Sequence, residues 1–425
     1  MRRTSGRSVL IGGAVAVAII ATVVVAVARP HSADADSSTT WVGTWAAAQH
    51  AAGATGLSQT GFDNQTIRMI VHTSVGGSAV RIRLSNEFGT TPLTVGEVTV
   101  ALPDKHDSSG VSTVRRVSFS GRPTIAIGVG AHVLSDAVKM DVPALGDLTV
   151  SLWLPQATGP ATFHTVSRAT SFVGKGDHAE DVAGGAFKAI SVPNPIPPAM
   201  DSPWFYLSGV DVMNDSAHGA VVVFGDSISD GFTSKVGGNA RWPDLLAKRL
   251  DALPASKHAP GVLNASLSGD ALGHQASNIP QLGPDAMSRI NTDVLGQTGV
   301  RIVIMQLGIN DILIWGDTAD AIVAEMRQVA LQMHEAGLRI YICTLTPWAG
   351  GPTWTVAGEK TRQAVNQYIR STSDFDGVID LDATLRDPDD HTRLRPSMDS
   401  GDHLHPTSLG YQAIANAMPL NKIIA

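Results

Sequence analysis

The stretch Ala220-Val-Val-Val-Phe-Gly-Asp-Ser-Ile-Ser-Asp-Gly231 decides the fold of the second half of this 425-residue chain. Its apolar run, residues 221–224, predicts a short buried strand. The Gly-Asp-Ser turn that follows predicts a sharp change of direction into a helix. A serine at such a turn presents its hydroxyl outward, beside the free N–H groups at the positive end of the next helix. Ser227 is therefore a candidate nucleophile, although Gly-Asp-Ser is also common in ordinary turns.

Short apolar strands and helices alternate through the rest of this half. Further strands are predicted over 262–265, 302–307, 340–345 and 378–381, and helices over 244–253, 284–295, 319–336, 360–371 and 408–417. This alternation is typical of parallel βαβ units with helices on both faces of the sheet. In such sheets the functional residues lie at the carboxyl ends of the strands.

Polar residues stand at these strand ends. Gly269 follows the strand at 262–265, where a glycine allows close backbone approach and its N–H can donate to an oxyanion. Asn310 follows the strand at 302–307, and its side-chain amide can donate to the same charge. Asp402 and His405 follow the last strand and lie in one turn. A serine nucleophile needs an imidazole base, and that base needs a carboxylate partner, so this pair could activate Ser227.

Each of these residues also has a plain structural explanation: a loop glycine, a capping asparagine, a polar entry to the last helix. A metal site with Asp402, His403 and His405 as ligands is a second alternative. That set has no obvious remote fourth ligand, which favours the serine–histidine–aspartate interpretation.

Taken together and in order, the strand-end residues resemble the four sequence blocks of the SGNH, or GDSL, hydrolases. The blocks read Gly225-Asp226-Ser227, Gly269, Gly308-x-Asn310-Asp311 and Asp402-x-x-His405-Pro406. The resemblance covers about residues 220–420. It implies a flavodoxin-like α/β/α sandwich with a parallel sheet, and an enzyme that acts on ester bonds.

The resemblance also implies roles for individual residues. Ser227 would be the nucleophile, His405 the base and Asp402 its support. The oxyanion hole would combine the backbone N–H groups of Ser227 and Gly269 with the side chain of Asn310, and neither a metal nor an organic cofactor would be needed. The chain departs from the family pattern at Ile228, where leucine is usual, and at His403, a second imidazole beside the expected one.

The first half of the chain has a β pattern. Apolar residues alternate with polar ones over 66–72 and 80–85, on either side of Gly76-Gly77, which predicts a hairpin. Similar runs recur at 93–102, 114–119, 124–127 and 148–154. These short strands predict a β-sandwich or jelly roll. A proline-rich segment over 191–203 ends this pattern, and a last strand over 204–212 could return to the first domain.

We expect three parts: a signal peptide or membrane anchor with a polar leader at 1–40, a β-sandwich domain at 41–216, and an SGNH hydrolase domain at 217–425. The whole chain resembles bacterial secreted members of the family with an N-terminal β-domain. That resemblance rests on Trp41-Val-Gly-Thr-Trp45, Arg83-Leu-Ser-Asn86 and Arg241-Trp-Pro-Asp244. Some carbohydrate esterases pair a jelly roll with this hydrolase domain, which is an analogy of architecture.

The N-terminal segment predicts export. Arg2, Arg3 and Arg7 precede the uncharged stretch 8–28, and Ala26-Val-Ala28 suits a signal peptidase. About 20 apolar residues would also span a bilayer, so a retained membrane anchor is the alternative to cleavage and secretion.

The composition limits the classes of binding partner that the protein can have. The formal net charge is −7, and no basic stripe is present, which argues against a nucleic-acid partner. Cys343 is the single cysteine of the sequence, so no intramolecular disulfide can form, and it lies in an apolar run.

The expected substrate is a small-molecule, lipid or polysaccharide ester, with a short acyl group favoured. An acyltransferase using the same site and a non-catalytic glycan-binding wall protein are the alternatives. The sequence does not fix the oligomeric state.

Overall fold

The first half of the chain forms an antiparallel β-sandwich. The computed structural model describes residues 40–190, 192–193, 200–274 and 282–424. In these residues one sheet has the order β1-β17-β3-β8, with β9 also on β3, and the other has the order β13-β12-β2-β10-β5-β6. The strands are β1 (Trp41–Ala46), β2 (Gln65–His72), β3 (Gly77–Ser85), β5 (Glu97–Pro103), β6 (Val111–Arg116), β8 (His132–Leu134), β9 (Val138–Val142), β10 (Asp147–Leu154), β12 (Ser171–Lys175), β13 (Lys188–Ala189) and β17 (Leu207–Met213).

Shorter elements complete this half. Three two-stranded pairs are β4 (Leu93–Val95) with β7 (Ile125–Ile127), β11 (Phe163–His164) with β16 (Trp204–Phe205), and β14 (Val192–Pro193) with β15 (Met200–Asp201). A single helical turn, α1 (Leu57–Thr60), precedes β2. The predicted strand over 204–212 is interrupted at Tyr206, whose φ is +60°. Its second part, β17, does return to the first half, where it pairs with β1 and β3.

The hairpin predicted around Gly76-Gly77 is wrong. β2 pairs with β10 and β12, whereas β3 pairs with β17, β8 and β9, so the chain passes from one sheet to the other between them. The glycines serve close packing. A Cβ on Gly76 would lie 2.5 Å from the carbonyl oxygen of Val142, and one on Gly77 would lie 2.5 Å from that of Met213. Alternation identifies a half-buried strand, but it does not identify the strand's partner.

The second half is built on a parallel sheet with the order β19-β18-β20-β21-β22. In chain order this is 2-1-3-4-5, the arrangement of flavodoxin-like folds. The strands are β18 (Ala220–Gly225), β19 (Gly261–Asn264), β20 (Val300–Gln306), β21 (Arg339–Cys343) and β22 (Gly377–Ile379). The predicted α/β/α fold with a preceding all-β part is therefore confirmed.

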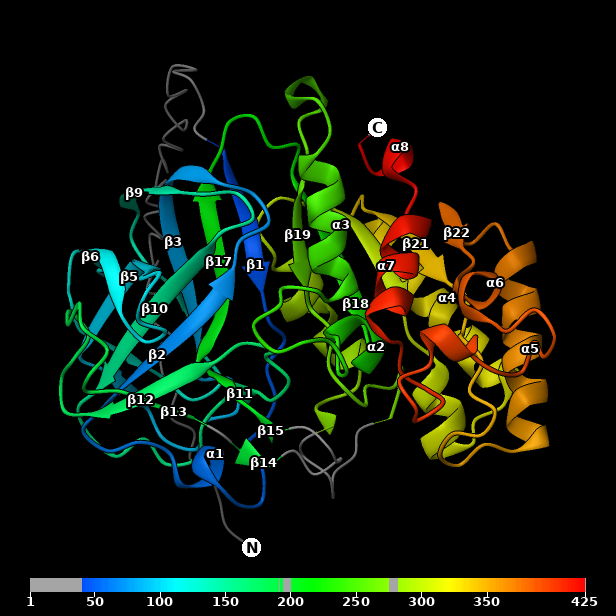
Figure 1. The fold of residues 1–425 in the computed structure, drawn as a ribbon, viewed down its shortest axis with the longest axis horizontal. Helices are drawn as coiled ribbons and strands as arrows, with labels where there is room; N and C mark the ends of the chain where they lie inside the picture. The colour runs from blue at the N-terminus through cyan, green and yellow to red at the C-terminus, as the bar shows by residue number, and fades with distance from the viewer. Residues whose placement is uncertain (1–39, 191, 194–199, 275–281, 425) are drawn as a thin grey trace, which may run out of the picture. The chain divides into compact units, whose positions relative to one another are not determined.

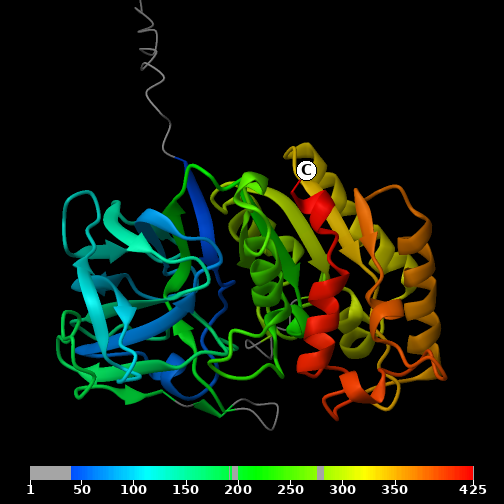
Figure 2. The same ribbon diagram turned by 45° about the horizontal axis from the view of Figure 1, so that its top comes forward.

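Helices cover both faces of this sheet, as Figures 1 and 2 show. The α-helices are α2 (Ser227–Asp230), α3 (Trp242–Asp251), α4 (Ala319–Glu335), α5 (Val356–Ser371), α6 (Leu381–Leu385), α7 (Ser408–Ala417) and α8 (Leu420–Ile423). Alternate strand residues separate two apolar clusters. Val221 and Val223 belong to the cluster that includes residues of α3 and α7, whereas Val222 belongs to the cluster that includes residues of α4 and α5. Because both faces of the sheet are buried under helices, the central strands have apolar residues at successive positions and no polar alternation.

One predicted helix differs from the structure. Over 284–295 the chain forms a 3₁₀ turn, η3 (Met287–Arg289), and then a wider π-helical turn, η4 (Asn291–Leu295). Arg289 at the junction is buried and binds Asp270 and Asp293, so its side chain is held inward. Other short turns are η1 (Ala255–Lys257), η5 (Asp311–Trp315) and η6 (Pro396–Met398).

Contacts join the two halves into one compact unit, Thr39–Ala425. The N–H of Gly43 donates to the carbonyl of Thr298 (3.0 Å), and that of Val262 donates to the Ser74 hydroxyl (2.9 Å). A single apolar cluster also runs through both halves. Antiparallel pairing ends with β17 and parallel pairing begins with β18, but the boundary at 216/217 itself stays a prediction.

The expectations for residues 1–40 concern a segment that lies, except for Thr40, outside the described residues. Within the described part of the chain, no helix has the length and apolar character needed to cross a bilayer. Cys343 is buried and unpaired, as its apolar surroundings predicted, and burial raises the pKa of its thiol well above the usual value.

Candidate active site

Ser227 begins α2 directly after β18 (Figure 1), at the carboxyl end of the parallel sheet. Asp226 caps the helix, because its carboxylate accepts a hydrogen bond from the N–H of Ile228 at 3.0 Å. The turn is tight at Gly225, where a Cβ would lie 2.6 Å from the Ser229 hydroxyl. Ser227 is 8% exposed, so its hydroxyl sits at the edge of the buried interior.

Ser227, His405 and Asp402 form a continuous hydrogen-bond chain. Ser227 Oγ lies 2.7 Å from His405 Nε2, and His405 Nδ1 lies 2.6 Å from Asp402 Oδ2. An ionised carboxylate only accepts hydrogen bonds, so Nδ1 of a neutral His405 carries the proton and Nε2 is free to accept from Ser227. This is the tautomer that a general base needs.

The Asp402 carboxylate is held in its ionised form. Partial burial raises its pKa, but the hydrogen bond from the His405 imidazole and the N–H groups of His405 and Leu404 more than offset this. These backbone bonds to Oδ1 measure 2.8 and 2.9 Å. The net result is a pKa for Asp402 well below its usual range, so the carboxylate stays charged whenever the site is folded.

His403 has a different partner. Its Nδ1 lies 2.6 Å from Asp399 Oδ2, and its side chain is 44% exposed. The backbone of His403 is left-handed, with φ +64°, which turns it away from the direction of His405. Asp402, His403 and His405 therefore do not converge on one point, and the metal-ligand alternative has no support in this geometry.

The loops that carry the expected oxyanion donors are hydrogen-bonded to one another and to the serine turn. The N–H of Leu267 donates to the carbonyl of Gly225 (3.0 Å), which joins the Gly269 loop to the turn. Asn310 Nδ2 donates one proton to the carbonyl of Asp270 at 2.8 Å, which joins the Asn310 and Gly269 loops and leaves the second amide proton for a ligand. Asn310 is 4% exposed.

Gly269 has a backbone that favours glycine. Its φ is +85°, and a Cβ there would lie 2.2 Å from Cδ2 of Leu282. Any other residue would strain this turn and push the loop away from Leu282. The strand-end rule thus locates Ser227, Gly269, Asn310 and the Asp402–His405 turn on one edge of the sheet.

Sequence reasoning missed a second layer of residues behind the Gly269 loop. Asp230, at the end of α2, accepts from the N–H of Ser268 at 3.0 Å and from its hydroxyl at 2.7 Å. The other oxygen of Asp230 lies 3.1 Å from Nε2 of His164, which comes from β11 of the sandwich. Burial lowers the pKa of His164, but the charge of the Asp230 carboxylate and its hydrogen bond to the ring raise the pKa by more. The pKa of His164 is therefore above its usual value.

No local motif could have revealed this layer, because its members come from distant parts of the chain. Arg289 is another example: it is buried, it binds Asp270 and Asp293, and it donates to the carbonyl of Ala265 at 2.7 Å. Both sets brace the segment from 265 to 270 that carries Gly269.

A serine, an imidazole and a carboxylate linked in this order, at the carboxyl end of a 2-1-3-4-5 parallel sheet, define the general class of serine hydrolases. The family comparison is more specific. Residues 223–413 match the model of the GDSL-like lipase/acylhydrolase family, so this part of the chain is a GDSL-like, or SGNH, hydrolase domain. It is accordingly a carboxylic ester hydrolase.

Solved structures of similar proteins match about half of this chain. A carbohydrate acetylesterase from Sinorhizobium meliloti is 16% identical, with 47% of this chain and 95% of that chain covered and a TM-score of 0.37. An acetylxylan esterase from Geobacillus stearothermophilus is 19% identical, with 49% and 95% covered and a TM-score of 0.37. A GDSL-like lipase from Bacteroides thetaiotaomicron is 17% identical, with 48% and 87% covered and a TM-score of 0.35. Among curated proteins, none matches the sequence.

Proposed function

We propose that the protein is a serine esterase that works outside the cytoplasm on short acyl esters or acetylated carbohydrates. In this proposal Ser227 is the nucleophile, His405 the general base and Asp402 its partner. The observation that supports it most directly is the hydrogen-bond chain from Ser227 Oγ through the His405 imidazole to Asp402, with distances of 2.7 and 2.6 Å.

The first half-reaction transfers the acyl group to the enzyme. His405 Nε2 takes the Ser227 proton while Oγ bonds to the ester carbonyl carbon, and the carbonyl oxygen becomes an oxyanion. Backbone N–H groups of Ser227 and Gly269 and the free amide proton of Asn310 would stabilise that charge. The intermediate then collapses, and the leaving alkoxide takes the proton from His405.

The second half-reaction releases the acid. A water molecule gives a proton to His405 Nε2 and attacks the acyl carbon, and collapse of the second intermediate returns the proton to Ser227 Oγ. Asp402 stays ionised throughout, because its pKa is held low, and it stabilises the imidazolium at each step.

Two parts of the proposal rest on the sequence. A short acyl group is favoured because no long apolar lid segment follows the first 40 residues. Export is favoured by the arginines at positions 2, 3 and 7 ahead of the uncharged stretch 8–28. N-terminal sequencing of the protein recovered from culture medium and from membranes tests export: cleavage after Ala28 or retention in the membrane agrees with it, and an intact protein confined to the cytosol contradicts it.

The activity is tested with p-nitrophenyl acetate, butyrate, octanoate and palmitate. We expect turnover of the short esters, and a fall in kcat of at least about 10⁴-fold in Ser227→Ala and in His405→Ala, because the members of such a triad act as a unit. His403→Ala is the matched control, since His403 is an imidazole two residues away with its own partner, and it should keep its activity within a few fold.

The outcomes separate the alternatives. Wild-type activity in Ser227→Ala would overturn the nucleophile, and a preference for palmitate over acetate would overturn the short-acyl assignment. Ester formation that exceeds hydrolysis when an alcohol is added would indicate an acyltransferase. If the wild type cleaves none of these esters and releases no acetate from acetylated glycans, the proposed hydrolysis is wrong.

A further inference from the structure

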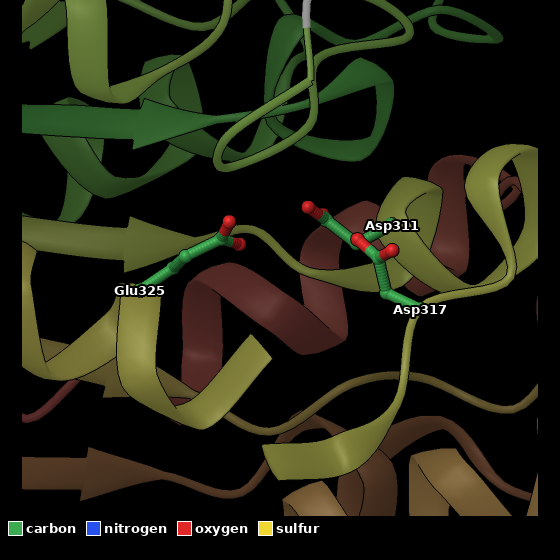
Figure 3. Close-up of side chains that lie close together, drawn as sticks. All are labelled: Asp311, Asp317 and Glu325. Atoms are coloured by element: carbon green, nitrogen blue, oxygen red, sulfur yellow. The ribbon is translucent and has the colours of Figure 1, made fainter. Parts of the chain in front are cut away.

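Three carboxylates converge behind the loop that carries Asn310. Asp311 begins η5, Asp317 precedes α4, and Glu325 lies on α4. One oxygen from each of the three lies within 4.8 Å of the others. Figure 3 shows the carboxyl groups of Asp311 and Glu325 directed toward one another, with Asp317 beside Asp311.

The buried member of the cluster has an unused oxygen that faces it. Asp311 is 0% exposed, and its Oδ1 accepts a hydrogen bond from the N–H of Leu272 at 2.9 Å. Its Oδ2 is buried and has no hydrogen-bond partner among the described residues. Oε2 of Glu325 is also buried and without a partner among the described residues. Burying a carboxylate oxygen without a hydrogen-bond partner costs free energy of folding. A bound cation between the two oxygens would remove that cost.

The neighbouring side chains do not supply that charge. Nε2 of His274 lies 2.7 Å from Asp317 Oδ2, at the outer side of the cluster, and the imidazole stacks on the Trp315 ring. No lysine or arginine in the described part of the chain forms an ion pair with the three carboxylates.

We propose that Asp311, Asp317 and Glu325 bind one hard divalent cation, with calcium preferred. All three ligand groups are carboxylate oxygens, which suit calcium, magnesium and manganese. Oxygens on opposite sides of a calcium ion are about 5 Å apart, whereas magnesium draws its ligands to about 2.1 Å and so to a tighter span of about 4.2 Å. The three oxygens lie within 4.8 Å of one another, a separation that a single calcium ion can bridge. His274 would hold Asp317 in position by its hydrogen bond.

The site would connect with the oxyanion loops. Asp311 follows Asn310 directly, and its other oxygen holds Leu272, three residues after Gly269. Gly273 lies against Glu325, since a Cβ on Gly273 would be 2.3 Å from Glu325 Oε1. A cation would therefore join η5 to α4, and the hydrogen bond between Asp311 and Leu272 would connect it to the loop that carries Gly269. It would act by holding the loop in place and would take no part in the chemical steps.

Calcium titration by isothermal calorimetry, on full-length protein treated with EDTA and desalted, tests the site. We expect one bound calcium per chain, and an affinity lower by about 10- to 100-fold or more in Glu325→Gln and in Asp317→Asn. Glu335→Gln is the matched control, because Glu335 is exposed and lies on the same helix about 15 Å further along. This control should bind calcium like the wild type.

Thermal unfolding gives a second readout that does not depend on activity. In EDTA, Glu325→Gln should be at least as stable as the wild type, because the substitution removes one repelling charge. With calcium present the order should reverse, since only the wild type gains from binding. Asp317→Asn is the second variant should Glu325→Gln not fold.

Absence of saturable binding of calcium, magnesium and manganese by the wild type would overturn the site, and so would equal calcium binding by the wild type and both variants. Binding of magnesium or manganese in preference to calcium would overturn the choice of ion. None of these readouts uses ester hydrolysis, so they are independent of the proposed function.

Discussion

The side-chain amide of Asn310 has two protons, and only one of them is used in a hydrogen bond within the described structure. One amide proton is donated to the carbonyl of Asp270 at 2.8 Å, and in the proposed mechanism the other would be donated to the developing oxyanion. We expect Asn310→Ala to lower kcat for p-nitrophenyl acetate by about 10²–10³-fold with a much smaller change in KM, because the donor acts mainly in the transition state. Initial-rate kinetics over a range of substrate concentrations measures both constants.

Loss of the structural bond must be separated from loss of the donor. The substitution leaves the Asp270 carbonyl without its partner, which costs about 1–3 kcal/mol of stability. Urea unfolding of Asn310→Ala therefore accompanies the kinetics, and rates are compared where both proteins are fully folded. A fall of less than about fivefold in kcat of the folded variant would contradict an oxyanion role for Asn310.

At the scale of single residues, the sequence predicts what depends on strand ends and on near neighbours. Ser227 and the Asp402–His405 turn could be chosen because a buried strand must end at the sheet edge, and because Asp402 and His405 are three residues apart. His164 and Asp230 could not be paired in advance, since their contact exists only after the sandwich and the parallel sheet have packed together. Asp311, Asp317 and Glu325 could not be grouped in advance either, because they converge only through the way the chain turns from η5 into α4.

At the scale of elements, His50 joins the segment after β1 to the segment after β11, and it does so as a neutral ring. Its Nδ1 lies 3.0 Å from the carbonyl of Ala51, which only accepts, and its Nε2 lies 3.2 Å from the N–H of Thr165, which only donates. Burial and the nearby His164 lower the pKa of His50 to about 3. Protonation of Nε2 would break the bond from the Thr165 N–H, and the Thr165 hydroxyl, 2.7 Å from Nε2, would then have to accept instead of donate.

This low pKa predicts a pH dependence of stability. The unfolded chain binds a proton at His50 below about pH 6.5, whereas the folded protein does not until about pH 3. The stability that neutral His50 provides is therefore complete above pH 6.5 and is lost as the pH falls toward 3, at up to about 1.4 kcal/mol per pH unit. We expect the stability advantage of wild type over His50→Gln to shrink by about 1 kcal/mol from pH 7.5 to 5.5.

Urea unfolding of both proteins at the two pH values measures this change. His164 acts in the opposite direction, because its raised pKa gives stability at low pH that is lost as the pH rises. His164 is present in both proteins, so most of its contribution cancels in the comparison. An advantage of wild type that grows toward pH 5.5 would show that His50 is not buried as a neutral ring.

Most elements of the α/β half follow from apolar runs and helical spacing, and the errors have local causes. The predicted helix over 284–295 ignores that Arg289 in its middle turns inward to two aspartates. The predicted hairpin at Gly76-Gly77 treats two glycines as a turn signal, although each is required by a carbonyl that lies 2.5 Å from where a Cβ would be. In both cases a tertiary contact decides the backbone, and a local pattern does not contain it.

At the scale of the whole molecule, the two halves share their interior. Leu263 of β19 is 0% exposed, and Gly43 of β1 packs so closely on it that a Cβ would lie 2.8 Å from Leu263 Cδ1. The same is true on the other side of the contact, where a Cβ on Gly261 would lie 2.1 Å from the Gly43 carbonyl oxygen. Composition shifts in the sequence predict where the pattern changes, but they do not show that the two patterns bury each other.

This shared interior predicts that the hydrolase half depends on the sandwich. A chain of residues 217–425 would expose Leu263, leave Asp230 without His164, and leave the N–H of Val262 without Ser74. We expect this fragment to lack a cooperative unfolding transition and to show little esterase activity, while residues 40–425 unfold in one transition and keep full activity. Circular dichroism during urea unfolding and p-nitrophenyl acetate hydrolysis measure the two properties. A monomeric 217–425 fragment that unfolds cooperatively and keeps full activity would contradict this dependence of the hydrolase fold on the sandwich. It would also show that the contact of His164 with Asp230, which supports the Gly269 loop, is not needed for activity.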